Sequence, residues 1–190
     1  MGNQPLVFPA PAWVITTYDK DDRPNMATAA WGGICCSKPP CIGVSFRAAT
    51  YTHGNILSRK AFCVCVPSEK HVAETDYVGI ASGRDVDKFE KTGLTALGSE
   101  LVDAPYVKEF PMVVECRLYK VFELGLHTQF VGEIMDVKVE ENLVGKSGLP
   151  ELHEVSPLVF APRTRHYYKV GEKLAKGFSI GRKTFEDSEK

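Results

Sequence analysis

The sequence predicts a mainly β protein, an antiparallel barrel with helices packed on its outside. Six or more of its segments are short and rich in β-branched, aromatic and other apolar residues, as strands are. The segments with a helical pattern are few, so strands and helices do not alternate as a parallel sheet requires. There is also no G-x-G-x-x-G and no Walker loop, so a nucleotide would not be held in the Rossmann manner. We expect residues 1–190 to form a single domain.

Strands and turns are predicted to alternate through the first part of the chain. Residues 13–18 are β-branched and aromatic, which predicts a strand. Residues 19–24 predict a turn because of their Asp, Arg and Pro content, and residues 26–36 predict a second strand that pairs with the first as a hairpin. Residues 37–40 contain two prolines, which lack the N–H that a sheet needs, and residues 41–46 predict a third strand.

Helices are predicted only in the middle of the chain. Residues 52–60 predict a helix with Thr52 as its N-cap. The apolar run 61–66 separates this helix from a second one, predicted from the N-cap candidate Ser68 to about residue 81. Residues 85–90 predict a third, short helix.

The remainder of the chain is more plainly β. Residues 112–122 and 129–139 predict two long strands, which are expected to pair through a connection around Gly125. Residues 158–160 and 166–168 predict two further short strands.

The composition argues against several classes of partner. The formal net charge is −1, and no basic stripe is present, so no nucleic-acid partner is expected. No apolar run approaches the roughly 18 residues of a membrane helix. Residues 1–11 lack the charged start and apolar middle of a signal peptide. We therefore expect a cytoplasmic protein that is not associated with a membrane.

The cysteines do not have the spacing of a metal site. No C-x-x-C occurs, and no cysteine lies beside a histidine at a zinc-ligand spacing, so no metal is predicted. The simplest interpretation is that the six are reduced thiols that act as small buried hydrophobes. An alternative is a redox-active thiol beside a bound cofactor, formed by Cys35 or Cys36, which directly follow a strand of small residues.

That strand of small residues is the first candidate binding element. Ala27, Ala29 and Ala30 would let the backbone approach a flat aromatic ring closely, and Thr28 adds a hydroxyl. Backbone N–H and C=O groups could then meet the polar edge of such a ring. The same residues also suit a tightly packed strand crossing in a small barrel, so both interpretations stay open.

A group of polar side chains follows and is the second candidate. Arg47 can contact a phosphate through two parallel hydrogen bonds. Thr52 lies at the predicted start of a helix, where free N–H groups attract anions, and Ser45 and Asn55 could complete the site. Taken singly, each residue is better explained as an exposed arginine, a helix cap or a surface amide, and the close spacing of the residues weakens that explanation.

Two basic residues further along the chain are weaker candidates. Lys88 follows two acidic residues, so it either belongs to a solvated charged face or reaches the phosphate. His127 either is an ordinary β-sheet histidine or stacks over a nicotinamide or flavin edge. No Ser-His-Asp or Cys-His arrangement is recognisable, so no catalytic side chain is predicted.

Taken together and in order, these segments resemble the flavin reductase-like family, which has an FMN-binding split-barrel fold, and within it the flavoredoxin branch. The resemblance covers roughly residues 11–168, which we expect to be the core of the domain. The segments that carry it are Asn25-x-x-Thr28-Ala-Ala-Trp31, Pro39-Pro40, Val44-Ser-Phe-Arg47, Thr52-x-x-Asn55-Ile56, Ser82-Gly-Arg-Asp-Val-Asp-Lys-Phe89 and His127-x-x-Phe130-x-Gly132-Glu133.

The resemblance implies a six-stranded antiparallel Greek-key split barrel and a homodimer with one FMN per subunit near the subunit interface. It places the isoalloxazine ring against Thr28, Ala29, Ala30 and Trp31. It assigns the ribityl chain and phosphate to Ser45, Phe46, Arg47, Thr52 and Asn55, with Lys88 and Phe89 as weaker candidates and His127 near the nicotinamide. This chain departs from related reductases at Ala30, where they often have a hydroxyl, and at Cys65, where they often have an asparagine.

The function expected from the resemblance is that of an FMN-binding redox protein. Such a protein transfers hydride or electrons between a reduced nicotinamide, NADH or NADPH, and the flavin, or between the flavin and a protein or small-molecule acceptor. One alternative is a flavoredoxin-type electron carrier with no NAD(P)H activity of its own. Another is an interaction module that uses the barrel without a cofactor.

Overall fold

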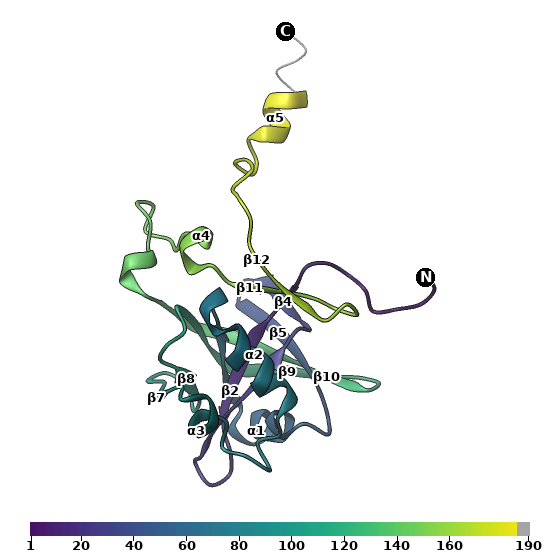
Figure 1. Cartoon of the computed structure of the whole chain (residues 1–190), viewed down its shortest axis with the longest axis vertical. Coiled ribbons are helices and arrows are strands. Elements are labelled where there is room, and N and C mark those ends of the chain that lie inside the picture. Colours follow the sequence, from purple (N-terminus) through teal and green to yellow (C-terminus); the bar gives the residue numbers. More distant parts are fainter. Residues whose placement is uncertain (186–190) are drawn as a thin grey trace.

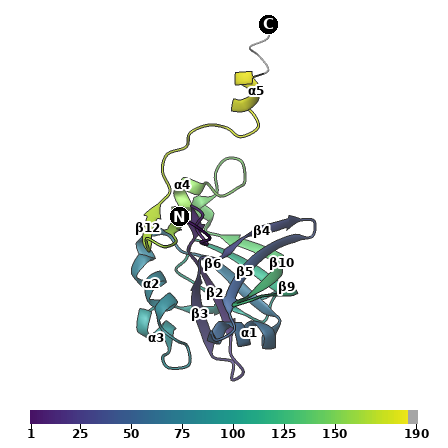
Figure 2. The same cartoon turned by 90° about the vertical axis from the view of Figure 1, so that its right-hand side faces the viewer.

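The computed structural model describes residues 1–185, so residues 186–190 of the predicted single domain lie outside the described part. Its centre is a seven-stranded antiparallel sheet with the strand order β3-β2-β6-β9-β10-β5-β4, rolled into a barrel (Figures 1 and 2). The strands are β2 (Trp13–Tyr18), β3 (Pro24–Ala29), β4 (Gly32–Ser37), β5 (Pro40–Arg47), β6 (Ala61–Val66), β9 (Met112–Leu124) and β10 (His127–Val139). The predicted antiparallel barrel with flanking helices is confirmed.

The predicted strand over residues 26–36 is in fact two strands, β3 and β4. The chain turns at Ala30 and Trp31, and the two strands lie at opposite ends of the sheet order. Gly32 permits this crossing, because a Cβ there would lie 2.7 Å from the ring of Trp13. The backbone of Trp31 also contacts β5, since its carbonyl accepts a hydrogen bond of 2.8 Å from the N–H of Ser45. Counted as one bent strand, β3 and β4 give the six strands of the predicted barrel.

The long hairpin of β9 and β10 was predicted correctly. The two strands pair along almost their whole length, from Leu124 opposite His127 to Met112 opposite Val139. Gly125 forms the connection in the left-handed region, with φ of 59°, which glycine adopts without strain. The end of this hairpin extends beyond the barrel (Figure 1).

The helices are present where they were predicted, but their starts differ. Helix α1 (Tyr51–Arg59) is capped by Thr50, whose hydroxyl accepts from the N–H of His53, and Thr52 lies inside the helix. A 3-10 turn, η1 (Glu69–His71), precedes α2 (Val72–Ile80). Helix α3 (Lys88–Thr92) begins after Asp87, whose carboxylate accepts from the N–H of Glu90. Figure 2 shows α2 and α3 on the outer side of β3.

Both faces of the central strands are buried. Val14 of β2 belongs to a cluster beneath α2 and α3, whereas its neighbour Ile15 belongs to a cluster inside the barrel. Cys63 and Cys65 share the first of these faces, as their spacing of two predicts. The thiols of Cys41 and Cys116 are buried as well, but those of Cys35 and Cys36 are exposed on β4, so the interpretation as buried hydrophobes holds for four of the six.

Several short elements complete the chain. Strands β11 (Leu158–Ala161) and β12 (His166–Lys169) confirm two predictions and form a small sheet with β1 (Ala10–Pro11). The elements not predicted from sequence are β1, β7 (Ala96–Gly98), β8 (Pro105–Val107), η2 (Glu141–Leu143), α4 (Leu152–Val155) and α5 (Ile180–Phe185). Helix α5 follows a segment that leaves the barrel (Figure 1). Among residues 1–185, no helix is both long and apolar enough to span a membrane.

Candidate functional site

A groove runs along the outer side of β3, between this strand and helix α2. Its inner part, here called the inner cleft, has a volume of about 250 Å³. It continues into an outer compartment of about 350 Å³, because Thr28, Gly79 and Ile80 line both. The inner cleft is further lined by the β5–α1 loop and the loop after α2, whereas the outer compartment is lined by Ala30 and the β11–β12 hairpin.

Close packing of α2 on β3 forms the floor of the groove. The hydroxyl of Thr28 donates a hydrogen bond to the carbonyl of Thr75 in α2. Gly79 allows the approach, because a Cβ there would lie 3.1 Å from the Cβ of Thr28. The small residues of β3 therefore serve both interpretations of the sequence at once: they pack against a helix and they line a groove.

Thr52 presents a hydroxyl at the wall of the inner cleft. Its side chain is buried, and its oxygen accepts a hydrogen bond of 3.0 Å from the amide nitrogen of Asn25. The hydroxyl proton of Thr52 is then free to be donated to a ligand. The amide oxygen of Asn25 has no hydrogen-bond partner among the described residues and lies against Gly83, where a Cβ would be 2.1 Å away.

One arginine side chain, that of Arg84, lines the inner cleft, and Arg47 lies on β5 next to the lining residue Phe46. Arg47 is exposed at the end of β5, and Arg84 is exposed in the loop after α2. Arg84 joins the two loops: its guanidinium donates a hydrogen bond of 2.9 Å to the carbonyl of Ala49 and lies 5.3 Å from the ring centre of Tyr51. Thr50 and Thr52 line the same cleft, and the hydroxyl of Thr50 already donates to the carbonyl of Arg47 at 2.9 Å. The hydroxyl of Thr52 and the guanidinium of Arg84 are the donors that suit an anion.

The structure brings only part of the predicted site residues to the groove. Thr28, Phe46, Thr52 and Lys88 line the inner cleft, and Ala30 lines the outer compartment. The other predicted residues do not line the groove. Ala29 is buried in the barrel core, Trp31 is exposed beyond the bend, and Ser45 and Arg47 flank Phe46 on β5. Asn55 is buried and its amide donates to the hydroxyl of Thr17 at 3.2 Å, whereas His127 lies on β10 opposite Arg47.

Lys88 lies in the groove wall with its nitrogen directed to the backbone. Its nitrogen donates to the carbonyl oxygens of Met26 and Val78, each at 2.8 Å, and its side chain is buried. Burial lowers the pKa of Lys88 from 10.5 to about 8. The residue therefore ties β3 to α2 through two backbone carbonyls, and its nitrogen is not directed to a phosphate.

The polar lining residues of the inner cleft that sequence reasoning did not assign are Thr50, Tyr51, Ser82 and Arg84. A signal was present for two of them, because Ser82 and Arg84 begin the segment in which only Lys88 and Phe89 were considered. Thr50 was missed because Thr52 was taken as the helix cap.

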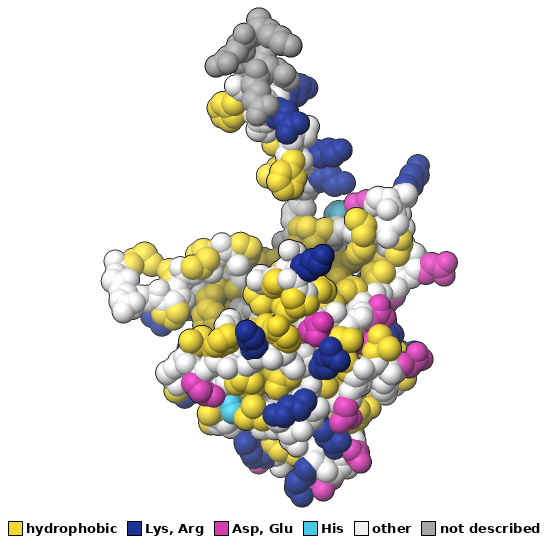
Figure 3. Space-filling model, turned by 180° about the vertical axis from the view of Figure 1, so that it is seen from behind, with side chains coloured by type: hydrophobic (Ala, Val, Ile, Leu, Met, Phe, Trp, Pro, Cys, Tyr) yellow, Lys and Arg dark blue, Asp and Glu magenta, His cyan; other side chains and the backbone are white. Residues whose placement is uncertain are grey.

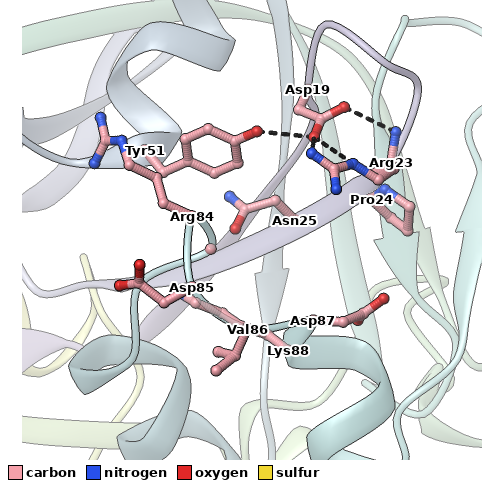
Figure 4. A pocket seen from close by; sticks show the side chains of 11 residues that line it. Asp19, Arg23, Pro24, Asn25, Tyr51, Arg84, Asp85, Val86, Asp87 and Lys88 are labelled. Carbon is pink, nitrogen blue, oxygen red and sulfur yellow. Dashed lines mark hydrogen bonds and ion pairs between the residues drawn. The ribbon is translucent and has the colours of Figure 1, made fainter.

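A third pocket of about 150 Å³ is lined by Tyr51 and by a mixture of acidic and basic side chains (Figure 4). In it the buried carboxylate of Asp19 accepts hydrogen bonds from the hydroxyl of Tyr51, at 2.8 Å, and from Arg23. Burial acts to raise the pKa of Asp19, but the hydrogen bonds from Tyr51 and from backbone N–H groups, with the charge of Arg23, hold this pKa below its usual value. Asp85 and Asp87 line the same pocket.

Comparison with known proteins relates this groove and barrel to flavoproteins. The model of the flavin reductase like domain matches residues 4–170. The structure of flavoredoxin from Desulfovibrio vulgaris (Miyazaki F) has a TM-score of 0.92 and 52% identity, covering 95% of this chain and 97% of that one. Flavoredoxin from Methanosarcina acetivorans has a TM-score of 0.89 and 27% identity, covering 97% of both chains.

A curated relative supports the same grouping. An uncharacterized protein of Archaeoglobus fulgidus is 35% identical over 132 residues, which cover 70% of this chain and 73% of the relative. Since the family model covers most of the barrel and all of the groove-lining elements, the chain belongs to the flavin reductase-like family.

Proposed function

We propose that this protein binds FMN in the groove along β3 and acts in electron or hydride transfer. The observation that carries the proposal is the shape and polarity of the groove. Its inner end has hydroxyls and Arg84, which suit a phosphate, and its outer part has Ala30, Ile80 and Phe160, which suit a flat ring. The likeness to two flavoredoxins supports the same cofactor.

The residues of the groove fit the parts of FMN in order. Thr52 and Arg84 would hold the phosphate through hydroxyl and guanidinium donors, with Arg47, exposed at the end of β5, as a further cation. The hydroxyl of Thr50 already donates to the carbonyl of Arg47 at 2.9 Å and would not be a donor to the phosphate. Phe46 and Thr28 would line the ribityl chain, and the backbone around Ala30 would meet the ring edge. Ser45 and Asn55 would act by fixing β5 and α1, because neither lines the groove.

The bound flavin supplies the redox chemistry by accepting and releasing a hydride or single electrons. The protein binds it, orients it and shields part of it from water. No acid–base side chain is assigned to the reaction, and the oxidoreductase activity rests on an electron donor such as NADH or NADPH. The outer compartment offers space beside the ring for a nicotinamide or an acceptor, and His127 stays a candidate nicotinamide contact.

We further propose that the protein is a homodimer. The end of the β9–β10 hairpin exposes Tyr119, Phe122, Leu124 and Leu126, and β4 exposes Ile34. Seen from behind, the molecule carries hydrophobic side chains over much of the barrel, with charged residues concentrated toward the lower part (Figure 3). Burial of these side chains against a second copy would be favourable at roughly 25 cal/mol per Å² of apolar area.

The test is the visible spectrum of the purified protein under anaerobic conditions, with added FMN and then with NADH or NADPH. We expect bound flavin that survives gel filtration and is bleached by one of the nicotinamides. Bound flavin that no nicotinamide reduces would favour the electron carrier, which the likeness to flavoredoxin also favours. A colourless protein that takes up no FMN would leave the cofactor-free interaction module.

A further inference from the structure

We infer that Tyr167 and Asp76 are positioning residues that hold the β11–β12 hairpin as one wall of the outer compartment, so that the site selects small, ring-sized electron donors and acceptors. This inference rests on the proposed function. The barrel and α2 form two sides of the compartment, and the hairpin supplies the third through Phe160, Arg165 and Tyr167. The place of the hairpin therefore sets the width of the compartment.

The pairing of the two strands decides which hairpin residues face the compartment. Tyr167 lies directly opposite Phe160, and residues opposite one another share a face of a sheet. Their ring centres are 5.2 Å apart. Tyr168, one residue further on, lines a different, apolar pocket on the hairpin together with Val159, its own partner in the register. Phe160 and Tyr167 thus form one aromatic surface of the compartment.

A hydrogen bond ties this aromatic surface to α2. The hydroxyl of Tyr167 donates to the carboxylate of Asp76 at 3.0 Å, and Figure 2 shows β12 beside α2. Hydrogen bonds to a charged acceptor are stronger than those between neutral groups. Burial and this hydrogen bond raise the pKa of Tyr167, so the hydroxyl keeps the proton that it donates. The bond joins two sides of the compartment and fixes their separation.

The other contacts of the hairpin lie mainly at its base. The N–H of Leu158 donates to the carbonyl of Pro67 at 3.2 Å, and β1 pairs with β11 over two residues. At the tip, Arg163 and Arg165 have φ values of 75° and 58°, in the left-handed region that is unfavourable for residues other than glycine. Such conformations persist only where surrounding contacts impose them. The bond from Tyr167 is the contact that we assign to this task.

The compartment selects by size rather than by charge. Its lining has one acidic side chain, Asp76, and one basic side chain, Arg165, so neither sign dominates. Its volume of about 350 Å³ is near the lower end of the roughly 300–1,000 Å³ of small-molecule sites. Because the ring of the flavin would itself enter this space, the room that remains suits a single small ring.

The first measurement is hydrogen exchange of residues 158–169, followed by mass spectrometry of the purified protein. Tyr167→Phe and Asp76→Ala remove the bond, and we expect at least fivefold faster exchange in both. Asp76→Asn keeps an acceptor oxygen and should retain most of the protection. Tyr168→Phe is the matched control, because it removes a hydroxyl outside the compartment, and it should exchange as the wild type does. Unchanged exchange in Tyr167→Phe would overturn the inference.

The second measurement tests selection by size. Photoreduced, FMN-loaded protein is reoxidised without oxygen by 1,4-benzoquinone, which has one ring, or by 9,10-phenanthrenequinone, which has three. Each quinone takes up two electrons and two protons, from the reduced flavin and the solvent, and becomes a hydroquinone. Free reduced FMN calibrates the intrinsic reactivity of the two quinones. Tyr167→Phe and Asp76→Ala should raise the rate constant for phenanthrenequinone at least fivefold and that for benzoquinone less than twofold.

The two variants should bind FMN as tightly as the wild type does, within twofold, because neither residue lies in the inner cleft. Equal acceleration of the two quinones, or none, would overturn the inference while the proposed function stood. Should Tyr167→Phe fail to fold, as judged by circular dichroism, Asp76→Ala against Asp76→Asn decides in the same way. A wild type that took up no FMN would instead show that the proposed function is wrong.

Discussion

The side-chain nitrogen of Lys88 lies 2.8 Å from the carbonyl oxygen of Met26, which connects the first residue of α3 to strand β3 in the interior. The same nitrogen lies 2.8 Å from the carbonyl oxygen of Val78 in α2. A neutral amine has two N–H groups, which these two carbonyls satisfy, whereas the ammonium form has a third that would need another partner. This arrangement agrees with the lowered pKa of about 8, which burial causes.

The first prediction is that stability depends on pH through Lys88. Between pH 8 and about 10.5 the unfolded chain keeps the proton of Lys88 while the folded chain loses it, so the unfolded state binds more protons and stability rises with pH. Below pH 8 both states are protonated and this contribution is constant. Urea unfolding from pH 7 to 10 should show the wild type gaining up to about 3 kcal/mol relative to Lys88→Met. Parallel pH profiles for the two proteins would contradict the assignment.

The second prediction concerns Gly83. Gly83→Ala places a Cβ 2.1 Å from the amide oxygen of Asn25, so the loop after α2 must shift. We expect a loss of roughly 2 kcal/mol in the free energy of unfolding and at least tenfold weaker FMN binding. Gly54→Ala is the control, because a Cβ at Gly54 meets nothing within 4 Å and alanine is the better helix former. An unchanged FMN affinity in Gly83→Ala would show that the loop does not contribute to the site.

A third prediction tests the hydroxyl of Thr52. Thr52→Val removes both the donor to the phosphate and the acceptor for Asn25, so FMN binding should weaken by one to two orders of magnitude, or roughly 1.5–3 kcal/mol. Thr52→Ser keeps the hydroxyl and should retain most of the affinity. Isothermal titration with FMN and with riboflavin separates the roles, because riboflavin lacks the phosphate. If Thr52→Val weakened riboflavin equally, the hydroxyl would not be a phosphate contact.

The fourth prediction is that the end of the β9–β10 hairpin forms the dimer contact. Phe122→Glu places a charge among exposed apolar side chains and should convert a dimer to a monomer in light scattering after gel filtration. Leu149→Glu, at an exposed leucine far along the chain from this hairpin, should leave the dimer intact. A dimer that persists in Phe122→Glu would place the interface elsewhere.

The fifth prediction concerns thiol reactivity. Burial raises the pKa of the Cys65 thiol to about 11 and also raises the pKa values of Cys41, Cys63 and Cys116, which are buried in the core. Only Cys35 and Cys36 should therefore react with maleimide in the native protein, and the other four only after unfolding.

The same two cysteines bear on a redox role. Neither lines the groove, so a variant with both changed to serine should keep flavin reduction by NADH unchanged. A large loss of this activity with normal flavin binding would instead support the redox-active thiol.

Local sequence patterns were sufficient for most of the strands. The β-branched runs of β2 and the alternation in β10 reflect side chains that fit a pleated surface, and this preference acts within a few residues. The same holds for the approximate positions of α1, α2 and α3. The helix starts were less well predicted, because Thr50 and Thr52 are both able to cap and only the course of the backbone after Arg47 selects Thr50.

By itself the sequence determined that the chain forms an antiparallel barrel, because strand propensity and hydrophobic pattern act locally. It also determined that a stretch of small residues and a group of hydroxyls and arginines are candidates for a site, because the order of the motifs can be read along the chain. Only the tertiary structure decided that the strand bends at Trp31 to close the barrel, that Lys88 turns inward to Met26, and that Arg84 lies at the end of the cleft. The physical reason is that these three outcomes depend on contacts between segments far apart in the chain. The packing of α2 against β3 decides whether a basic side chain is buried or faces a ligand, and no local pattern records that packing.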